Sequence, residues 1–138
     1  MKKQSGFTLI ELIAVIVILA ILAVVAVPQF VDLRVQAANA TAAGVGGAIS
    51  SGTSLNYARG VAAGSGASTV TGCTAAQLQA LLAGGTLPTG GSITGYTIAG
   101  AAGLTSGQTT VCTITANGVT GTAAQNFTII GCANGSCG

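Results

Sequence analysis

The chain has 138 residues, enough for one domain of ordinary size. Half of the residues are hydrophobic but 4% are charged, against about 25% in an average soluble domain, which argues against a free-floating cytosolic protein. The charged side chains sum to +2 and form no basic patch, so we expect no direct contact with nucleic acid; they are Lys2, Lys3, Glu11, Asp32, Arg34 and Arg59.

The absence of histidine removes many kinds of active site. A serine or cysteine nucleophile has no histidine base, and no histidine is present to bind a metal. The carboxylates of Glu11 and Asp32 would lie about 30 Å apart on one helix, too far to act together. We therefore predict that the protein is not an enzyme and that it holds no cofactor and no metal.

The first predicted elements are a basic leader, residues 1–6, and an apolar helix, residues 7–27. A helix of this length covers about 30 Å, the thickness of the hydrocarbon core of a membrane. A secretory signal peptide would have a shorter apolar run without an internal charge. Glu11 lies inside the run, and neither a signal peptide nor a simple membrane anchor explains it.

An alanine-rich stretch after the apolar segment extends the predicted N-terminal helix to residue 59. Pro28 lacks a backbone N–H and crowds the preceding turn, so we predict a kink at this residue. Gly44, Gly46 and Gly47 predict a bent or frayed stretch because glycine destabilises helix interiors.

Residues 60–138 form the predicted globular head, which begins with a small, polar loop. We expect a short helix over residues 75–83, with Thr74 and Gln77 as a reciprocal capping box. Runs rich in Thr, Ile and Val predict three strands, over residues 93–99, 109–116 and 125–130. The predicted fold class is therefore α+β: a long N-terminal helix followed by a small antiparallel sheet.

Four cysteines lie in the C-terminal half of the chain. Their spacing lacks the repeated short gap of a zinc site, so disulfides in an oxidising compartment are the preferred interpretation. Four cysteines allow three pairings, and the sequence leaves the choice open. Our preference is Cys73 with Cys112 and Cys132 with Cys137.

Glu11 suggests a device that sets the register between copies of the chain. A carboxylate moved from lipid into a dry protein interior needs a positive partner or a proton. The apolar segment offers no Lys or Arg before Arg34, but cleavage after Gly6 would expose the α-amino group of Phe7. That amine could meet Glu11 of its own helix or, in a second copy displaced along the axis, Glu11 of a neighbour.

The N-terminus resembles the precursors of type IV pilins and of the pseudopilins of type II secretion. The resemblance is carried by the basic leader, by Gly6-Phe7-Thr8-Leu9-Ile10-Glu11, and by the apolar run that ends at Pro28. The continuation Val-Pro-Gln-Phe-Val-Asp-Leu, residues 27–33, is similar to pilins of the mannose-sensitive haemagglutinin type. Beyond residue 60, only the general pattern of sheet and cysteines fits.

The resemblance implies a role for each residue of this segment. Gly6 would direct prepilin peptidase to cut before Phe7, which would become the N-methylated first residue. Glu11 would pair with the terminal amine of a neighbour, and the helix near Pro28 could locally unwind. The implied partners are the peptidase and methylase, an assembly platform with its ATPase, and other copies in a helical filament. The precursor would lie in the inner membrane and the mature subunit in an extracellular pilus.

Three functions remain open at this point. The leading interpretation is a structural subunit of a type IV pilus. A pseudopilin of a type II secretion system is the related alternative, and a single-pass, membrane-anchored periplasmic binding module is a different one. Asp32 is the only acidic residue after Glu11, so the chain lacks the calcium-binding acidic clusters that would indicate a major pseudopilin.

Overall fold

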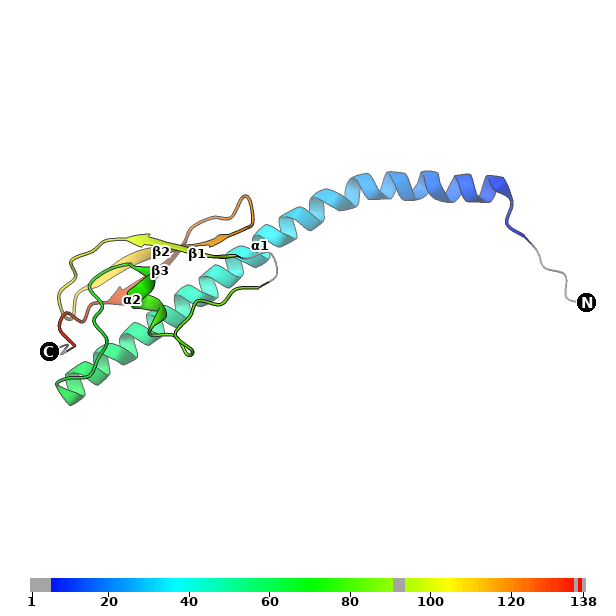
Figure 1. Ribbon diagram of the computed structural model, residues 1–138. Helices are drawn as coiled ribbons and strands as arrows, with labels where there is room; N and C mark the ends of the chain where they lie inside the picture. The colour runs from blue at the N-terminus through cyan, green and yellow to red at the C-terminus, as the bar shows by residue number, and fades with distance from the viewer. Residues whose placement is uncertain (1–5, 91–93, 136, 138) are drawn as a thin grey trace, which may run out of the picture. The chain divides into compact units, whose positions relative to one another are not determined.

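The computed structural model describes residues 6–90, 94–135 and 137, without the side chains of residues 27–29 and 31. Within these ranges the chain forms two helices and three strands, in the order α1, α2, β1, β2, β3 (Figure 1). It divides into a first unit, residues 1–34, and a second unit, residues 35–138. The predicted α+β class, an apolar N-terminal helix followed by a small antiparallel sheet, is confirmed.

Helix α1 (Leu9–Ala63) begins two residues later and ends four residues later than the predicted 7–59. Gly64 follows the last residue of α1, has a φ of 67° and donates its N–H to the Gly60 carbonyl at 3.0 Å. Glycine favours this left-handed conformation at the position after a helix. The kink predicted at Pro28 falls on a side chain outside the described residues and stays a prediction.

The frayed stretch expected at Gly44, Gly46 and Gly47 is absent, because α1 stays helical through all three. Gly46 is buried, and a Cβ there would lie 3.1 Å from Cβ of Phe127 on the sheet. A larger residue would therefore hold the sheet away from the helix. Helix propensity alone predicted fraying at Gly46, but packing against the sheet offsets the destabilisation that glycine causes in a helix.

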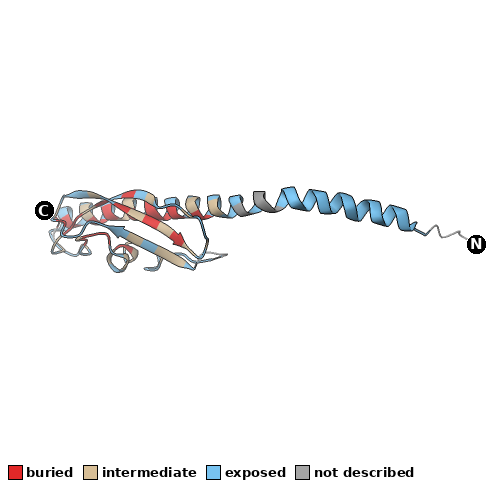
Figure 2. Cartoon of the chain, turned by 90° about the horizontal axis from the view of Figure 1, so that it is seen from above, coloured by how far each residue is buried: buried red, intermediate tan, exposed pale blue. Residues whose placement is uncertain are grey.

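In the second unit, one face of α1 packs against the sheet. Figure 2 shows the buried residues recurring along this part of the helix, between exposed ones. Apart from the adjacent Val45 and Gly46, they are spaced three or four apart, as one face of a helix requires: Ala38, Ala42, Val45, Gly46, Ile49, Thr53, Asn56 and Gly60.

The three strands form one antiparallel sheet in the order β1, β2, β3. Their bounds are Gly95–Gly100, Thr109–Asn117 and Gln125–Ile130. Alternate residues of the central strand β2, namely Cys112, Ile114 and Ala116, are buried in the core. The other face of the sheet is rich in threonine, as Thr97 pairs with Thr115 and Val111 with Thr128. The register thus separates an apolar inner face from a polar, uncharged outer face.

Helix α2 (Ala75–Gln79) is shorter than the predicted 75–83, and its predicted capping box is wrong. Thr74 has the extended backbone of an N-cap but makes no side-chain capping bond. Gln77 instead bonds to Thr71, through its Oε1 to the Thr71 N–H at 3.2 Å and through its Nε2 to Oγ1 at 3.1 Å. Leu78 is fully buried, so α2 adds one side chain to the core.

Gly60 and Gly47 provide a matched pair of helical glycines for testing the packing of α1. A Cβ at Gly60 would overlap Sγ of Cys137, whereas a Cβ at Gly47 would meet nothing within 4 Å. We expect Gly60→Ala to destabilise the second unit by about 1–3 kcal/mol. Gly47→Ala should stabilise it by up to about 1 kcal/mol. Thermal unfolding of the full chain in detergent measures both, and a stabilised Gly60→Ala variant would contradict the packing.

Candidate functional site

The segment that the sequence singles out begins just before α1. Gly6, Phe7 and Thr8 are non-helical, and the first helical residue is Leu9. The peptide bond between Gly6 and Phe7 therefore lies outside the helix. The Phe7 side chain is 87% exposed, so this stretch contacts little else in the described chain.

Thr8 and Glu11 form a reciprocal capping box at the start of α1. The Glu11 carboxylate oxygen Oε2 accepts hydrogen bonds from the Thr8 N–H at 2.8 Å and from the Thr8 hydroxyl at 2.7 Å. The Glu11 N–H is 3.4 Å from Thr8 Oγ1, which can accept it. This arrangement satisfies N–H groups that a helix N-terminus leaves without intrahelical partners.

The capping role of Thr8 was not predicted, although its signal is present in the sequence. A threonine followed three residues later by a glutamate, directly before an apolar run, is the sequence signature of a capping box. From the sequence, the positive partner expected for Glu11 was the Phe7 amine, of its own helix or of a neighbouring copy. The structure shows that Glu11 has a local role as well, because it fixes where α1 begins.

The second carboxylate oxygen of Glu11 has capacity for another partner. Both bonds from Thr8 go to Oε2. Among the residues that the structure describes, no donor is bonded to Oε1. An ionised carboxylate has about four acceptor sites on its two oxygens. Glu11 can therefore cap its own helix and accept a bond from another donor at the same time.

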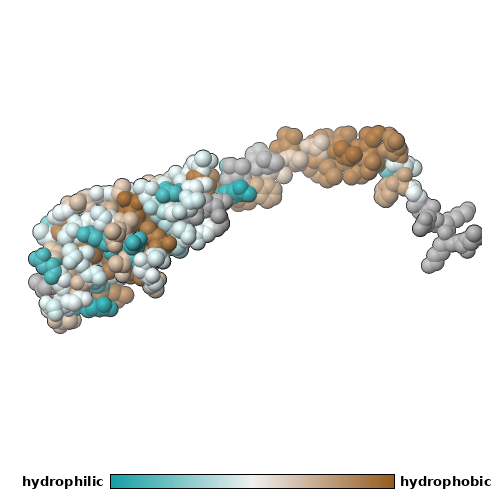
Figure 3. Space-filling view, in the orientation of Figure 1, coloured by the Kyte–Doolittle hydropathy of each residue, from teal (hydrophilic) through white to brown (hydrophobic). Residues whose placement is uncertain are grey.

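The first half of α1 presents large apolar side chains on every face. Leu9–Ala26 is the one segment of the described residues that is long and apolar enough to cross a membrane. Its side chains are exposed all round, as Figure 3 shows on the visible face. Because helices of soluble proteins usually have a polar face, this segment requires lipid or another apolar partner.

All four cysteines form disulfides in the structure, in the pairing preferred from the sequence. Cys73 bonds to Cys112 and joins the segment before α2 to strand β2. Cys132 bonds to Cys137 and closes a small loop near the C-terminus. These bridges lie in the second unit and stabilise it by restricting the unfolded chain.

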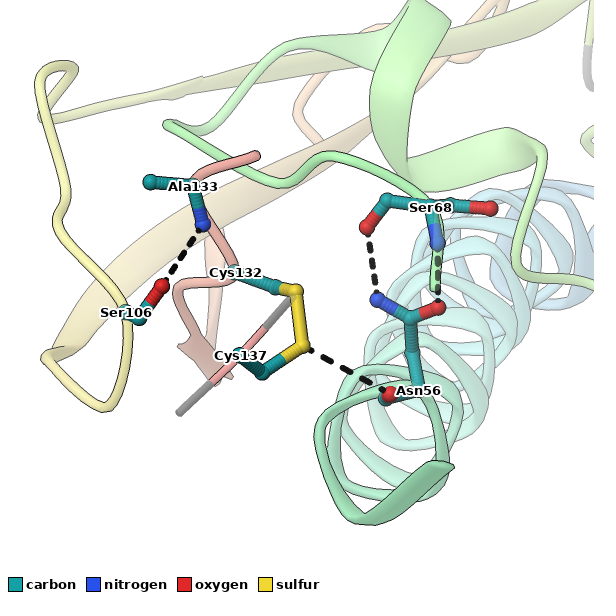
Figure 4. The surroundings of a disulfide bond; sticks show 6 residues. All are labelled: Asn56, Ser68, Ser106, Cys132, Ala133 and Cys137. Atoms are coloured by element: carbon teal, nitrogen blue, oxygen red, sulfur yellow. Dashed lines mark hydrogen bonds between the residues drawn. A yellow bond between two sulfur atoms is a disulfide. The ribbon is translucent and has the colours of Figure 1, made fainter. Parts of the chain in front are cut away.

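The C-terminal disulfide packs against the last turns of α1 (Figure 4). Sγ of Cys137 lies 3.8 Å from the carbonyl oxygen of Asn56. The Asn56 side chain exchanges two hydrogen bonds with the backbone of Ser68, at 2.7 and 2.8 Å. Gly60 is buried beside Cys137, which explains why a glycine occupies this helical position.

Comparison with known families identifies the N-terminal segment. A family model described as the prokaryotic N-terminal methylation motif matches residues 1–27. This motif is the leader of type IV pilins and pseudopilins, so the chain carries a pilin-type leader. The finer resemblance to pilins of the mannose-sensitive haemagglutinin type is not confirmed. No curated protein and no solved structure is significantly similar to the chain.

The match shows a pilin-like or pseudopilin leader motif at residues 1–27, and this motif points to a structural subunit rather than an enzyme. Its leader motif and apolar helix fit a membrane-anchored precursor. The match includes Gly6, Phe7, Thr8 and Glu11, the residues that the structure places at the start of α1.

The capping box can be tested by comparing two substitutions of Thr8. Thr8→Ala removes the hydroxyl that accepts the Glu11 N–H, and we expect it to weaken the first turn by about 0.5–2 kcal/mol. Thr8→Ser keeps the hydroxyl and should behave like the original chain. Amide hydrogen exchange at Glu11 and Leu12, measured on the protein in detergent micelles, reports this difference. Equal exchange in the alanine and serine variants would contradict the capping role.

Proposed function

We propose that the chain is the precursor of a structural subunit of an extracellular type IV pilus, which polymerises through its N-terminal helix after the leader is removed. The observation that carries this proposal is the order of features at the start of α1. A non-helical Gly6–Phe7 bond precedes a capped helix whose apolar side chains are exposed on all faces. Such a helix suits lipid first and the helices of other copies afterwards.

Gly6 and Phe7 are the proposed sites of processing. Prepilin peptidase would cut between them, and the methylase activity would modify the new amine of Phe7. The position of this bond before the first turn of α1 supports the assignment, because a protease can bind an extended segment without unwinding a helix. Cleavage removes Lys2 and Lys3, so the side-chain charges of the mature subunit sum to zero.

Glu11 is the proposed register residue of assembly. Its unoccupied oxygen Oε1 supports a role in accepting the N-terminal amine of a neighbouring copy. An amine–carboxylate pair in a dry interior is strong enough to favour one axial offset over others. The carboxylate need not give up its bonds to Thr8, so the helix start stays ordered when the new pair forms.

Moving the helix from lipid to a filament releases little free energy, because lipid tails are about as apolar as leucine. An assembly platform and its ATPase would therefore supply the work of extraction from the inner membrane.

The chain's own composition favours a pilus over a secretion pseudopilus, since Asp32 is the only acid after Glu11.

The register role of Glu11 predicts a specific assembly defect. We expect Glu11→Gln subunits to be cleaved but not to form filaments, because a neutral amide cannot neutralise the buried amine. Asp32→Asn is the matched control, since it also removes one carboxylate and should leave assembly intact. Electron microscopy of sheared cell-surface material measures filaments, and mass spectrometry identifies subunits that begin at methylated Phe7. Normal filaments from Glu11→Gln would refute the register role.

The same measurements on the original chain separate the three candidate functions. Extracellular fibres composed of cleaved subunits support the pilus. Cleaved subunits that stay in the cell envelope and are required for protein secretion support the pseudopilin instead. Uncleaved monomers in the membrane support the anchored binding module. Gly6→Val should leave the precursor uncut, which identifies the peptidase step independently of assembly.

A further inference from the structure

The chain contains two Asn-Gly sequences, at Asn117-Gly118 and Asn134-Gly135. An asparagine followed by glycine is prone to intramolecular deamidation, because no side chain shields the next backbone nitrogen. In a folded protein, reaction also requires that the asparagine amide and the following N–H are free to approach each other. The two sites differ in this respect.

Asn134 lies in the small loop closed by Cys132 and Cys137 and is exposed. Its φ of 149° and the φ of 71° at Gly135 both lie outside the conformations that most residues prefer. Among the residues that the structure describes, neither the Asn134 side chain nor the Gly135 N–H makes a hydrogen bond. The Gly135 carbonyl accepts the Ala67 N–H at 3.1 Å, a bond that uses the oxygen of Gly135 and not its nitrogen.

Asn117 is held at the end of strand β2. Its side-chain Oδ1 accepts the Thr97 hydroxyl at 3.0 Å, and its carbonyl accepts the Thr94 N–H at 3.0 Å. Asn117 also pairs with Gly95 in the sheet register. Reaction at Asn117 would therefore have to break the bond to Thr97 and open the end of the sheet.

We propose that Asn134 is a site of spontaneous deamidation in the native protein and that Asn117 is protected from the same reaction. The backbone nitrogen of Gly135 attacks Cγ of Asn134 and forms a C–N bond. The side-chain amide leaves as ammonia, taking up the proton lost by the nitrogen. Water then opens the resulting five-membered succinimide at either carbonyl and leaves aspartate or isoaspartate. The net reaction consumes one water and releases one ammonia.

The product changes the charge of a nearly uncharged surface. Arg59 is the only charged side chain between residues 35 and 138, so one new carboxylate reduces the side-chain sum of the second unit from +1 to zero. The carboxylate also arises in the loop that packs against the last turns of α1, where helix carbonyls carry partial negative charge. The fraction of modified subunits increases with time, so it records the age of the protein. This inference does not depend on the proposed function.

The experiment compares both sites in the same molecule. The purified full chain in detergent is incubated at 37 °C at pH 7.4 and pH 9.0, and its peptides are analysed by mass spectrometry that distinguishes aspartate from isoaspartate. We expect Asn134 to react at least tenfold faster than Asn117, and faster at the higher pH because the attacking nitrogen must lose a proton. In the denatured chain with intact disulfides, the two rates should become similar.

Two variants and two outcomes make the test decisive. Thr97→Val removes the hydroxyl bonded to Asn117 and should accelerate reaction there without changing Asn134. Asn134→Gln should abolish the change at residue 134, because glutamine cyclises far more slowly. Equal rates in the native chain, or protection of Asn134 in the native chain compared with the denatured chain, would overturn the proposal.

Discussion

The apolar side chains of Leu9–Ala26 lack a protein partner within the described chain, and this constraint governs the rest of the structure. Burying each large aliphatic side chain is worth about 1.5–3 kcal/mol relative to water, so the segment cannot stay in an aqueous phase. Lipid can surround these apolar side chains without any folded partner, and packed helices bury them about equally well. A chain of this kind is therefore suited to exchange one apolar environment for another.

The two halves of α1 solve different packing problems with different residues. The first half has large side chains on all faces, as a helix surrounded by lipid or by other helices requires. In the second unit, the face toward the sheet contains small residues where the sheet and disulfide approach most closely, at Gly46 and Gly60. Asn39 extends the contact between α1 and the β2–β3 connection by accepting the Ala123 N–H at 2.9 Å. The helix is thus both the apolar segment and the support of the head.

The sequence predicted the elements whose signal is local and missed those that depend on contacts across the fold. Strands β2 and β3 begin and end within one residue of their predicted bounds, because local runs rich in Thr, Ile and Val define them directly. Gly46 was misinterpreted because Phe127, the residue that requires it, is distant in sequence. Gln77 was assigned to Thr74 by spacing, but Thr71 offers it both a donor and an acceptor.

At the candidate site, Glu11 was predicted from the sequence, but the capping role of Thr8 was not. The bonds from Thr8 change how the charge of Glu11 is stabilised. An unpartnered carboxylate would lose hydration on entering a dry interior and would need full compensation from one new amine. Because Thr8 already supplies two donors to Oε2, part of that compensation is present in the single chain. The proposed amine then has to complete the coordination of Oε1 only. Thr8 therefore lowers the cost of carrying a charge along the proposed route from membrane to filament. Its bonds fix the carboxylate at the start of the helix, where a neighbour's N-terminus could reach it in the proposed assembly.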